Sequence, residues 1–196
     1  MKPIDRVLDF LHLNLDDRQH QQLLTFGQWL ATEAVAAGGI GSGDLSRLDS
    51  RHLADSLLFA SQLGPVAEVW DLGSGVGLPG IPLAIVRPET SFVLIDRSGR
   101  RVNLARRAVR VLGLENCQVE REEIGSLTGP APALVARASL SPDRLRPIAE
   151  HLLPPGGVMV TGGSWIRRPQ PEGWVAIEIP EDVLGQPVWL LKMRRS

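Results

Sequence analysis

The stretch from Asp71 to Gly80 reads Asp-Leu-Gly-Ser-Gly-Val-Gly-Leu-Pro-Gly, with three of its glycines at alternate positions. Because glycine has no Cβ, such a stretch can turn tightly and can let a ligand approach its backbone. Asp96 stands 21 residues after Gly75, at the end of the next apolar run. In folds with this pattern, a carboxylate at that point accepts hydrogen bonds from a ribose diol. The loop and Asp96 together predict a site for a cofactor that contains adenosine.

Two classes of cofactor compete for this loop, because its last three glycines also satisfy the spacing of a dinucleotide fingerprint. Asp71 would lie close to a pyrophosphate, and like charges at short range are costly. Pro79 and Pro82 remove backbone N–H donors from the first turn of the following helix, where phosphate would bind. S-adenosylmethionine carries no phosphate, and its positive charges suit a nearby carboxylate. The loop therefore favours S-adenosylmethionine over a dinucleotide, and either over a glycine turn without a ligand.

The elements that position this loop follow Gly64-Pro65, where short apolar runs alternate with helical segments. This alternation predicts a parallel sheet covered on both faces, an α/β fold of the Rossmann type. Two further runs follow one another with a short connection and no helix, which predicts an antiparallel hairpin that closes one sheet edge. The seven expected strands are residues 68–72, 91–95, 118–120, 133–136, 157–161, 174–179 and 188–193.

Residues 1–64 carry a helical pattern instead. Apolar residues recur at steps of three and four after the cap Asp16-Asp17, and Gly38-Gly39 ends that run. A second helix is expected after Asp44, with its apolar face toward the core. We therefore expect a helical region, 1–64, packed on a cofactor-binding core, 65–196. The residues that define the two helices are Leu23, Leu24, Gly27, Leu30 and Ala34, then Leu45, Leu48, Leu53, Leu57 and Ala60.

Composition describes one globular unit of 196 residues, with 21 Lys and Arg against 22 Asp and Glu. The single cysteine, Cys117, allows no disulfide framework and no zinc knuckle, and we expect it to be a small buried residue. We expect no metal. An acidic residue, Asp5, precedes any long apolar run, and no run approaches the ~18 residues of a membrane span. These features predict a cytoplasmic protein without a signal peptide or a membrane segment.

Four motifs resemble the glucose-inhibited division protein B family, bacterial methyltransferases that modify N7 of a guanine in 16S ribosomal RNA. The resemblance covers roughly residues 13 to 150. It implies a class I methyltransferase with a mostly parallel seven-stranded sheet, a C-terminal antiparallel hairpin and a small N-terminal helical region. The motifs are Arg51-His52-x-x-Asp55-Ser56, Asp71-x-Gly73-x-Gly75-x-Gly77-Leu78-Pro79-Gly80-Ile81-Pro82, Asp96-x-x-Gly99-Arg100-Arg101-Val102 and Arg137-Ala138.

The resemblance also implies which residues contact the ligands. S-adenosylmethionine is the cofactor, and Asp96 holds its ribose. Arg51, His52 and Asp55 are expected at the mouth of the site, although Arg51 and Asp55, four apart on a helix, could simply pair there. Arg100 and Arg101 are candidate substrate contacts. The expected cofactor contacts are Asp71, Gly73, Ser74, Gly75, Gly77, Leu78, Asp96, Arg97, Glu122, Glu123 and Arg137.

Methyl transfer to guanine N7 needs no general base, because N7 has a free lone pair. Alignment of the reacting atoms is the main demand, and it can supply about 7–11 kcal/mol of the barrier. An RNA substrate would suit the basic segment 97–110, whose outward face carries arginines and whose other face carries apolar residues. A solvated helix surface is the alternative interpretation. The outward residues are Arg100, Arg106, Arg107 and Arg110, and the inward ones are Val102, Ala105, Val109 and Leu112.

The sequence departs from the family pattern in three places, one of which is a third-strand segment that is one residue shorter. Residues 31–46 carry glycines where the family has an asparagine motif, and Val160-Thr161-Gly162-Gly163 replaces a Leu-Lys-Gly motif. Three functions therefore stay open: methylation of ribosomal RNA, methylation of a small molecule, and a cofactor-binding, ribosome-associated paralogue without turnover. The expected partner is ribosomal RNA or the small ribosomal subunit, and the expected oligomeric state is a monomer.

Overall fold

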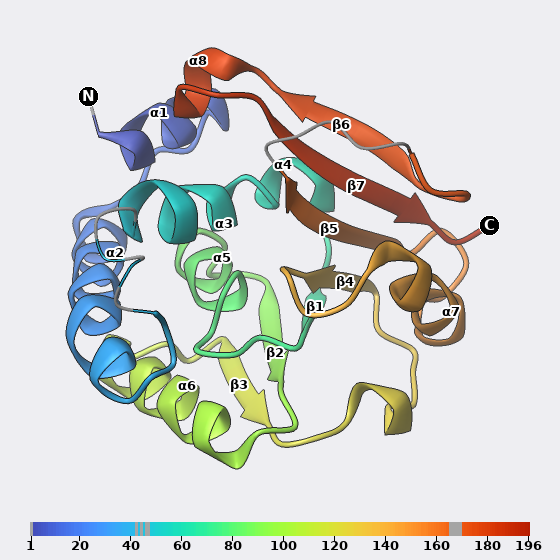
Figure 1. Ribbon diagram of the computed structural model, residues 1–196, viewed down its shortest axis with the longest axis horizontal. Coiled ribbons are helices and arrows are strands. Elements are labelled where there is room, and N and C mark those ends of the chain that lie inside the picture. Colours follow the sequence, from blue (N-terminus) through green and yellow to red (C-terminus); the bar gives the residue numbers. More distant parts are fainter. Residues whose placement is uncertain (1, 42, 44, 46–47, 165–169) are drawn as a thin grey trace.

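The computed structural model describes residues 2–41, 43, 45, 48–164 and 170–196, with the side chains of residues 51, 163 and 164 excepted (Figure 1). Its centre is a seven-stranded sheet in the order β3-β2-β1-β4-β5-β7-β6. The first five strands are parallel, and β7 is antiparallel to both β5 and β6. The strands are β1 (Glu68–Leu72), β2 (Ser91–Ile95), β3 (Cys117–Glu120), β4 (Ala133–Ala136), β5 (Val158–Ser164), β6 (Val175–Ile179) and β7 (Val188–Arg194).

The predicted sheet is confirmed, and three of its strands have the expected bounds. The prediction of a helix-free connection between β6 and β7 is wrong, because α8 (Glu181–Leu184) lies there. Two acidic residues, Glu181 and Asp182, occupy the first turn of α8, where the helix dipole favours negative charge. Gly185, with φ of 78°, ends the helix. A helix of four residues is too short to show a 3.6-residue period in the sequence.

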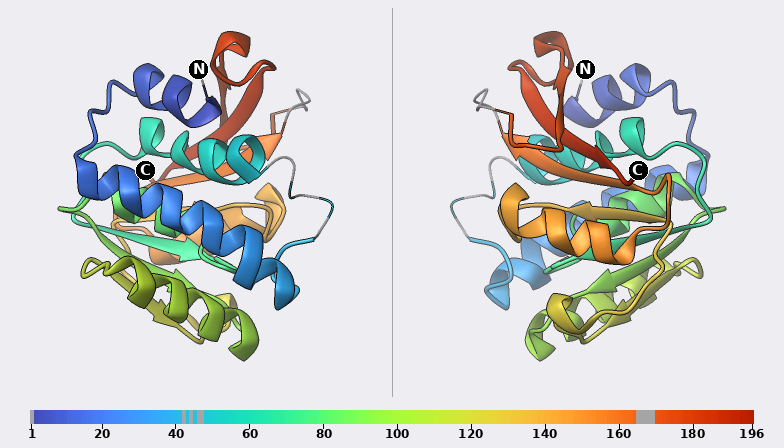
Figure 2. Two further views of the ribbon diagram at one scale, coloured as in Figure 1. Left: turned by 90° about the vertical axis from the view of Figure 1, so that its left-hand side faces the viewer. Right: turned by 90° about the vertical axis from the view of Figure 1, so that its right-hand side faces the viewer.

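Helices cover both faces of the sheet, as predicted. α5 (Gly80–Val86) and α6 (Gly99–Leu112) pack on one face together with the N-terminal helices, and α7 (Pro142–Leu152) packs on the other. Figure 2 shows α7 on the opposite side of the sheet from α2 (Asp17–Trp29) and α5. Because β1 to β5 run parallel, their carboxyl ends meet at one edge of the sheet, where ligands bind in folds of this kind.

The N-terminal region shares a hydrophobic core with α5 and α6. Asp16 caps α2, as predicted, because its side chain accepts a hydrogen bond of 2.7 Å from the N–H of Gln19. The expected second helix is described from Leu48, and its expected start at Asp44 lies outside the described residues. The remaining helical elements are α1 (Pro3–Phe10), which the sequence did not predict, two π-helical turns, η1 (Leu30–Ala34) and η3 (Leu48–Ala54), then α3 (Asp55–Leu57) and α4 (Ala60–Leu63).

Candidate cofactor and substrate site

The glycine loop between β1 and α5 has a backbone that only glycine adopts readily. The φ angles are 75° at Gly73, 60° at Gly75 and 99° at Gly77. The N–H groups of Gly73 and Ser74 donate to the carbonyl of Ile95, at 2.8 and 3.0 Å, and thereby fix the loop to the end of β2. A Cβ added at Gly75 would meet no heavy atom within 4 Å. The loop is therefore open at Gly75, the point that a ligand can reach.

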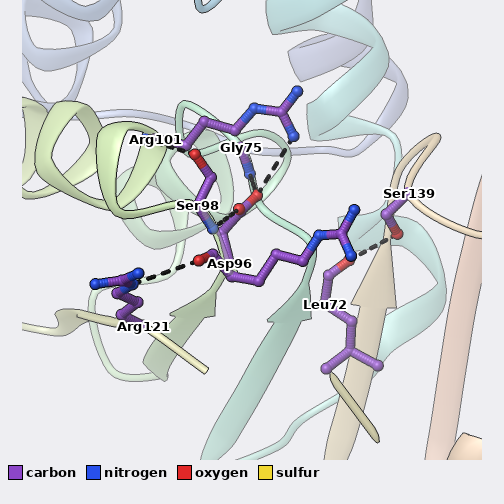
Figure 3. Close-up of polar contacts among 8 residues, drawn as sticks. Leu72, Gly75, Asp96, Ser98, Arg101, Arg121 and Ser139 are labelled. Atoms are coloured by element: carbon purple, nitrogen blue, oxygen red, sulfur yellow. Dashed lines mark hydrogen bonds and ion pairs between the residues drawn. The ribbon is translucent and has the colours of Figure 1, made fainter. Parts of the chain in front are cut away.

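Asp96 joins the glycine loop to the start of α6. One carboxylate oxygen, Oδ2, accepts from the N–H of Gly75 at 3.0 Å, and Oδ1 accepts from the N–H of Ser98 at 2.8 Å. Arg101 Nη1 lies 3.8 Å from Oδ2, and Figure 3 shows Arg101 above Asp96 on the side of α6. Asp96 is 4% exposed. The carboxylate thus lies beside the open glycine, where the sequence predicts a contact with ribose.

Asp71 lies beneath the loop and is fully buried. Its Oδ2 accepts a hydrogen bond of 2.8 Å from the N–H of Gly80, the first residue of α5. Burial raises the pKa of Asp71 to about 7, although the bond from Gly80 opposes this rise. Within the part of the chain that the structure describes, Asp71 Oδ1 and the neighbouring Ser74 Oγ have no hydrogen-bond partner. Asp71 therefore supports the loop from below, and its contact with a cofactor stays a prediction.

The position of Asp71 bears on the choice between the two cofactor classes. In a dinucleotide site, the pyrophosphate accepts hydrogen bonds from the N–H groups that begin this helix. Here the N–H of Gly80 already donates to a carboxylate, and prolines at positions 79 and 82 supply no N–H. The loop therefore suits a cofactor without phosphate.

Arg137, directly after β4, contacts the N-terminal helical region. Its Nη1 lies 3.5 Å from Asp55 Oδ2, and its Nη2 donates to His52 Nδ1 at 3.1 Å. Arginine has only donors, so Nδ1 of His52 accepts, and the ring is the tautomer with its proton on Nε2. His52 and Asp55 are both buried. The structure thus brings together three predicted site residues from motifs more than 80 positions apart.

The sequence also allowed Arg51 to pair with Asp55 along the helix. The side chain of Arg51 lies outside the described residues. Asp55 pairs with Arg137 across the site, and its pairing with Arg51 stays a prediction.

Other predicted site residues differ in exposure. Ser74 and Leu78 are buried within the loop, at 2% and 5% exposure. Glu122 and Glu123 are exposed just after β3, and Glu122 accepts from Ser126 Oγ at 3.4 Å. Arg97 is also exposed, directly after Asp96. All five follow the carboxyl ends of β1, β2 or β3, and their contacts with a ligand stay predictions.

The basic segment is partly engaged by the protein itself. Arg106 Nε and Nη2 both donate to the carbonyl of Val119, at 3.0 and 2.9 Å, and Arg107 forms an ion pair of 2.8 Å with Glu33. Arg100 packs against Gly38, where an added Cβ would lie 2.8 Å from its Nη2. The predicted inward face is confirmed by the burial of three of its residues, while Val109 is half-buried.

Ser139 is a residue that the sequence analysis missed. Its Oγ donates to the carbonyl of Leu72 at 2.7 Å, which ties the segment after β4 to the end of β1 (Figure 3). A Cβ added at Gly73 would lie 2.5 Å from the Cβ of Ser139. Between Arg137 and Ser139, Ala138 has φ of 55°, a strained value for a residue with a side chain. The sequence carries no signal for either feature beyond their position after a predicted strand.

The remaining chemistry of the described residues is limited. Burial raises the pKa of the Cys117 thiol to about 12, which confirms a buried, unreactive cysteine at neutral pH. Among residues 2–41, 43, 45, 48–164 and 170–196, no group of His, Cys, Asp and Glu could hold a metal ion. Over the same residues, every helix is too short or too polar to cross a bilayer.

The sheet order and the loop define a class I methyltransferase fold. A solved S-adenosylmethionine-dependent methyltransferase from Aquifex aeolicus is similar to this chain with a TM-score of 0.57 and 16% identity, over 77% of this chain and 93% of the other. The methyltransferase SibL in its apo form gives a TM-score of 0.59 and 18% identity, over 73% and 55% of the two chains. The predicted fold class is confirmed.

The chain belongs to the GidB family, described as rRNA small subunit methyltransferase G, whose family model matches residues 19–165. The resemblance drawn from the motifs is therefore confirmed. The ribosomal RNA small subunit methyltransferase G of Acidothermus cellulolyticus is 37% identical over 138 residues, which are 70% of this chain and 62% of that protein. The protein of the same name from Yersinia pseudotuberculosis is 30% identical, over 96% and 90% of the two chains. The chain thus spans less than two thirds of the first of these relatives.

Proposed function

We propose that the protein is an S-adenosylmethionine-dependent methyltransferase that modifies N7 of a guanine in 16S ribosomal RNA. Membership of the rRNA small subunit methyltransferase G family supports this substrate. The observation that carries the choice of cofactor is the pair of carboxylates around the glycine loop. Asp71 takes the helix N–H that a diphosphate would need, and Asp96 lies at the open glycine, Gly75, where a ribose can be held.

The site fits a nucleoside bound at the carboxyl edge of the sheet. Gly75 offers space for close approach, and Asp96 offers acceptor oxygens beside that space. Glu122 and Glu123, which are exposed after β3, are proposed contacts to the far end of the nucleoside. Arg137 borders the other end, where the methionine part of the cofactor and the guanine would meet. The loop residues themselves enclose the cofactor through their backbone.

The bound cofactor supplies a methyl group on a sulfonium, so that the N7–carbon bond forms as the sulfur–carbon bond breaks and a neutral thioether leaves. The protein need not remove a proton from guanine N7. Its task is to align the purine with the methyl group, which can supply about 7–11 kcal/mol of the barrier. Arg137, fixed by His52 and Asp55, is a rigid wall for this alignment. Arg100 and Arg101, at the start of α6, are proposed contacts to the RNA.

Ribosomal RNA, alone or within the small ribosomal subunit, is the proposed partner, and the cytoplasm is the proposed location. A monomer is the proposed acting species. The proposed partner, location and oligomeric state concern the whole protein. The match to the relative from Acidothermus cellulolyticus covers 62% of that relative.

Two measurements test the proposal. Calorimetric titration with S-adenosylmethionine, and separately with NAD, is expected to give heat with the former only. Mass mapping of 16S ribosomal RNA from a strain that lacks the gene is expected to show the loss of one N7-methylguanosine. Unchanged ribosomal RNA together with cofactor binding would leave a small-molecule methyltransferase or a paralogue without turnover. No heat with S-adenosylmethionine would remove the proposed cofactor.

A further inference from the structure

A groove of about 470 Å³ lies between α6 and β3, away from the glycine loop. This volume falls within the ~300–1,000 Å³ that is usual for ligand sites. The residues that line it belong neither to the glycine loop nor to the cluster of Arg137, His52 and Asp55. Its lining residues are Asn103, Arg106, Val109, Arg110, Cys117 and Val119.

The chemistry of the groove combines an apolar floor with a basic rim. Val109, Cys117 and Val119 form the floor, which is uncharged at neutral pH because burial keeps the Cys117 thiol protonated. Arg106 and Arg110 lie on the rim, and no carboxylate lines the groove.

The acidic residue nearest in sequence is directed elsewhere. Cys117 and Val119 are buried whereas Gln118 and Glu120 are exposed, because side chains alternate between the two faces of a strand. Glu120 therefore belongs to the opposite face of β3 from the groove. The floor of the groove therefore contributes no negative charge to neutralise Arg106 and Arg110.

The guanidinium of Arg106 is held in place at the groove. Its Nε and Nη2 both donate to the carbonyl of Val119, so the charge stays on the outer edge of β3. β3 is the last strand on its side of the sheet. An extended peptide that paired with β3 would have to displace Arg106 from this carbonyl, which disfavours a peptide as the occupant.

The groove lies along the same helix, α6, that begins beside the proposed active site. α6 begins at Gly99, three positions after Asp96, and its residues 103–110 lie about 6–17 Å farther along the helix axis. An RNA chain that follows α6 away from Asp96 would reach the groove. Figure 3 shows Arg101 and Arg121 near Asp96 at the start of α6.

We propose that this groove binds single-stranded RNA a few nucleotides away from the target guanine, because β2 and β1 lie between β3 and β4, the strand that Arg137 follows. Arg106 and Arg110 would neutralise phosphates, and the apolar floor would support an unstacked base. This inference rests on the proposed function, since it assigns the flanking RNA of the same substrate. The charge of the rim and the fixed position of Arg106 support RNA over a peptide.

The test compares two arginines of the same helix. Arg110→Ala removes a rim charge, while Arg107→Ala removes an equal charge from the flank of α6 that pairs with Glu33. The affinity of each variant for a fluorescein-labelled single-stranded RNA with one guanine is measured over a series of salt concentrations. We expect Arg110→Ala to bind about threefold to tenfold more weakly at low salt and to lower the log-log salt slope by ~0.7. Arg107→Ala is expected to change both quantities much less.

A second measurement does not depend on a variant. The same RNA, with 4-thiouridine placed in turn at each of the nearby positions on either side of the guanine, is irradiated with the unmodified protein, and the attached peptides are identified by mass spectrometry. Attachment to segment 103–110 or 117–119 supports the groove. Attachment only elsewhere, or equal losses in the two arginine variants, would overturn it.

Cofactor titration keeps the two proposals apart. Both variants are expected to bind S-adenosylmethionine as the parent does, because neither arginine contacts the glycine loop. If the parent binds no S-adenosylmethionine but only Arg110→Ala lowers RNA affinity, the groove stands and the proposed function fails. If cofactor binding is intact and neither variant alters RNA affinity, the groove fails alone.

Discussion

The guanidinium of Arg137 lies 3.5 Å from the carboxylate of Asp55, and this contact joins the end of β4 to the N-terminal helical region. Both side chains are largely buried, at 15% and 5% exposure. The site wall therefore belongs to both parts of the chain.

The pair predicts a measurable coupling. In a double-mutant cycle of Arg137→Gln and Asp55→Asn, the coupling free energy of unfolding is expected to be about 0.5–3 kcal/mol, because two partly desolvated charges lose each other. Urea unfolding of the four proteins measures it. Arg144→Ala, at an exposed position of α7, serves as the control and is expected to change stability within ~0.5 kcal/mol. A coupling free energy near zero would show that the contact between Arg137 and Asp55 does not stabilise the folded protein.

Asp71 predicts a specific pH dependence of stability. Its pKa in the folded protein is about 7, above the ordinary 3.8, so the folded state holds this proton more tightly than the unfolded state. The contribution of Asp71 is fully present below pH 4, is lost as the pH rises to 7, and stays constant above. Asp71→Asn does not titrate, and its stability relative to the parent is expected to rise over this window by roughly 4 kcal/mol, since one pKa unit corresponds to ~1.4 kcal/mol.

Urea midpoints of the two proteins at a series of pH values check this expectation. A difference that does not vary between pH 4 and pH 8 would contradict an elevated pKa. Asp9→Asn, an exposed change in α1, controls for charge alone.

Replacement of Asp96 tests the ribose assignment. Asp96→Ala removes the acceptor of the Gly75 and Ser98 N–H groups as well as the proposed ribose contact. We expect cofactor binding to weaken by about 1–3 kcal/mol, measured by titration calorimetry. Asp143→Ala, an exposed acid at the start of α7, is expected to leave the titration unchanged. An unaltered curve for Asp96→Ala would exclude this carboxylate from the ribose.

Ser139 provides a test of how the loop is supported. Ser139→Ala loses the hydrogen bond to the carbonyl of Leu72, at a cost of about 1 kcal/mol in stability. Because this bond holds the segment that packs on Gly73, the dissociation constant of the cofactor is expected to rise severalfold. The matched control is Ser141→Ala, since Ser141 caps α7 without a side-chain hydrogen bond. Equal behaviour of the two variants would refute a role in supporting the loop.

Much of the fold could be predicted because its signals are local. The strands are short apolar runs, and the cap at Asp16 and the glycines of the loop each mark their own turn. α8 and the π-helical turns could not be predicted, since neither is long enough to impose a period on the sequence.

The site was predicted less completely, because its contacts join distant positions. The motifs indicated Asp55 and Arg137 separately, but only the packing of η3 and α3 against β4 makes them partners. The charge of Asp71 was expected to oppose phosphate, while its bond to Gly80 depends on how α5 leaves the loop. Arg106 was expected on the outward face of its helix, but its contact with the carbonyl of Val119, which fixes the guanidinium at the edge of β3, depends on how α6 packs.

The order of the last two strands in the sheet affects when they can fold during synthesis. Among the strands of the described residues, β6 pairs with β7 alone, and β7 lies between β6 and β5. When β6 leaves the ribosome it has no partner in the sheet, and its residues must wait until β7 has also emerged. β6 and β7 therefore dock together as one late unit, and an aggregation-prone edge at β5 stays uncovered until they do.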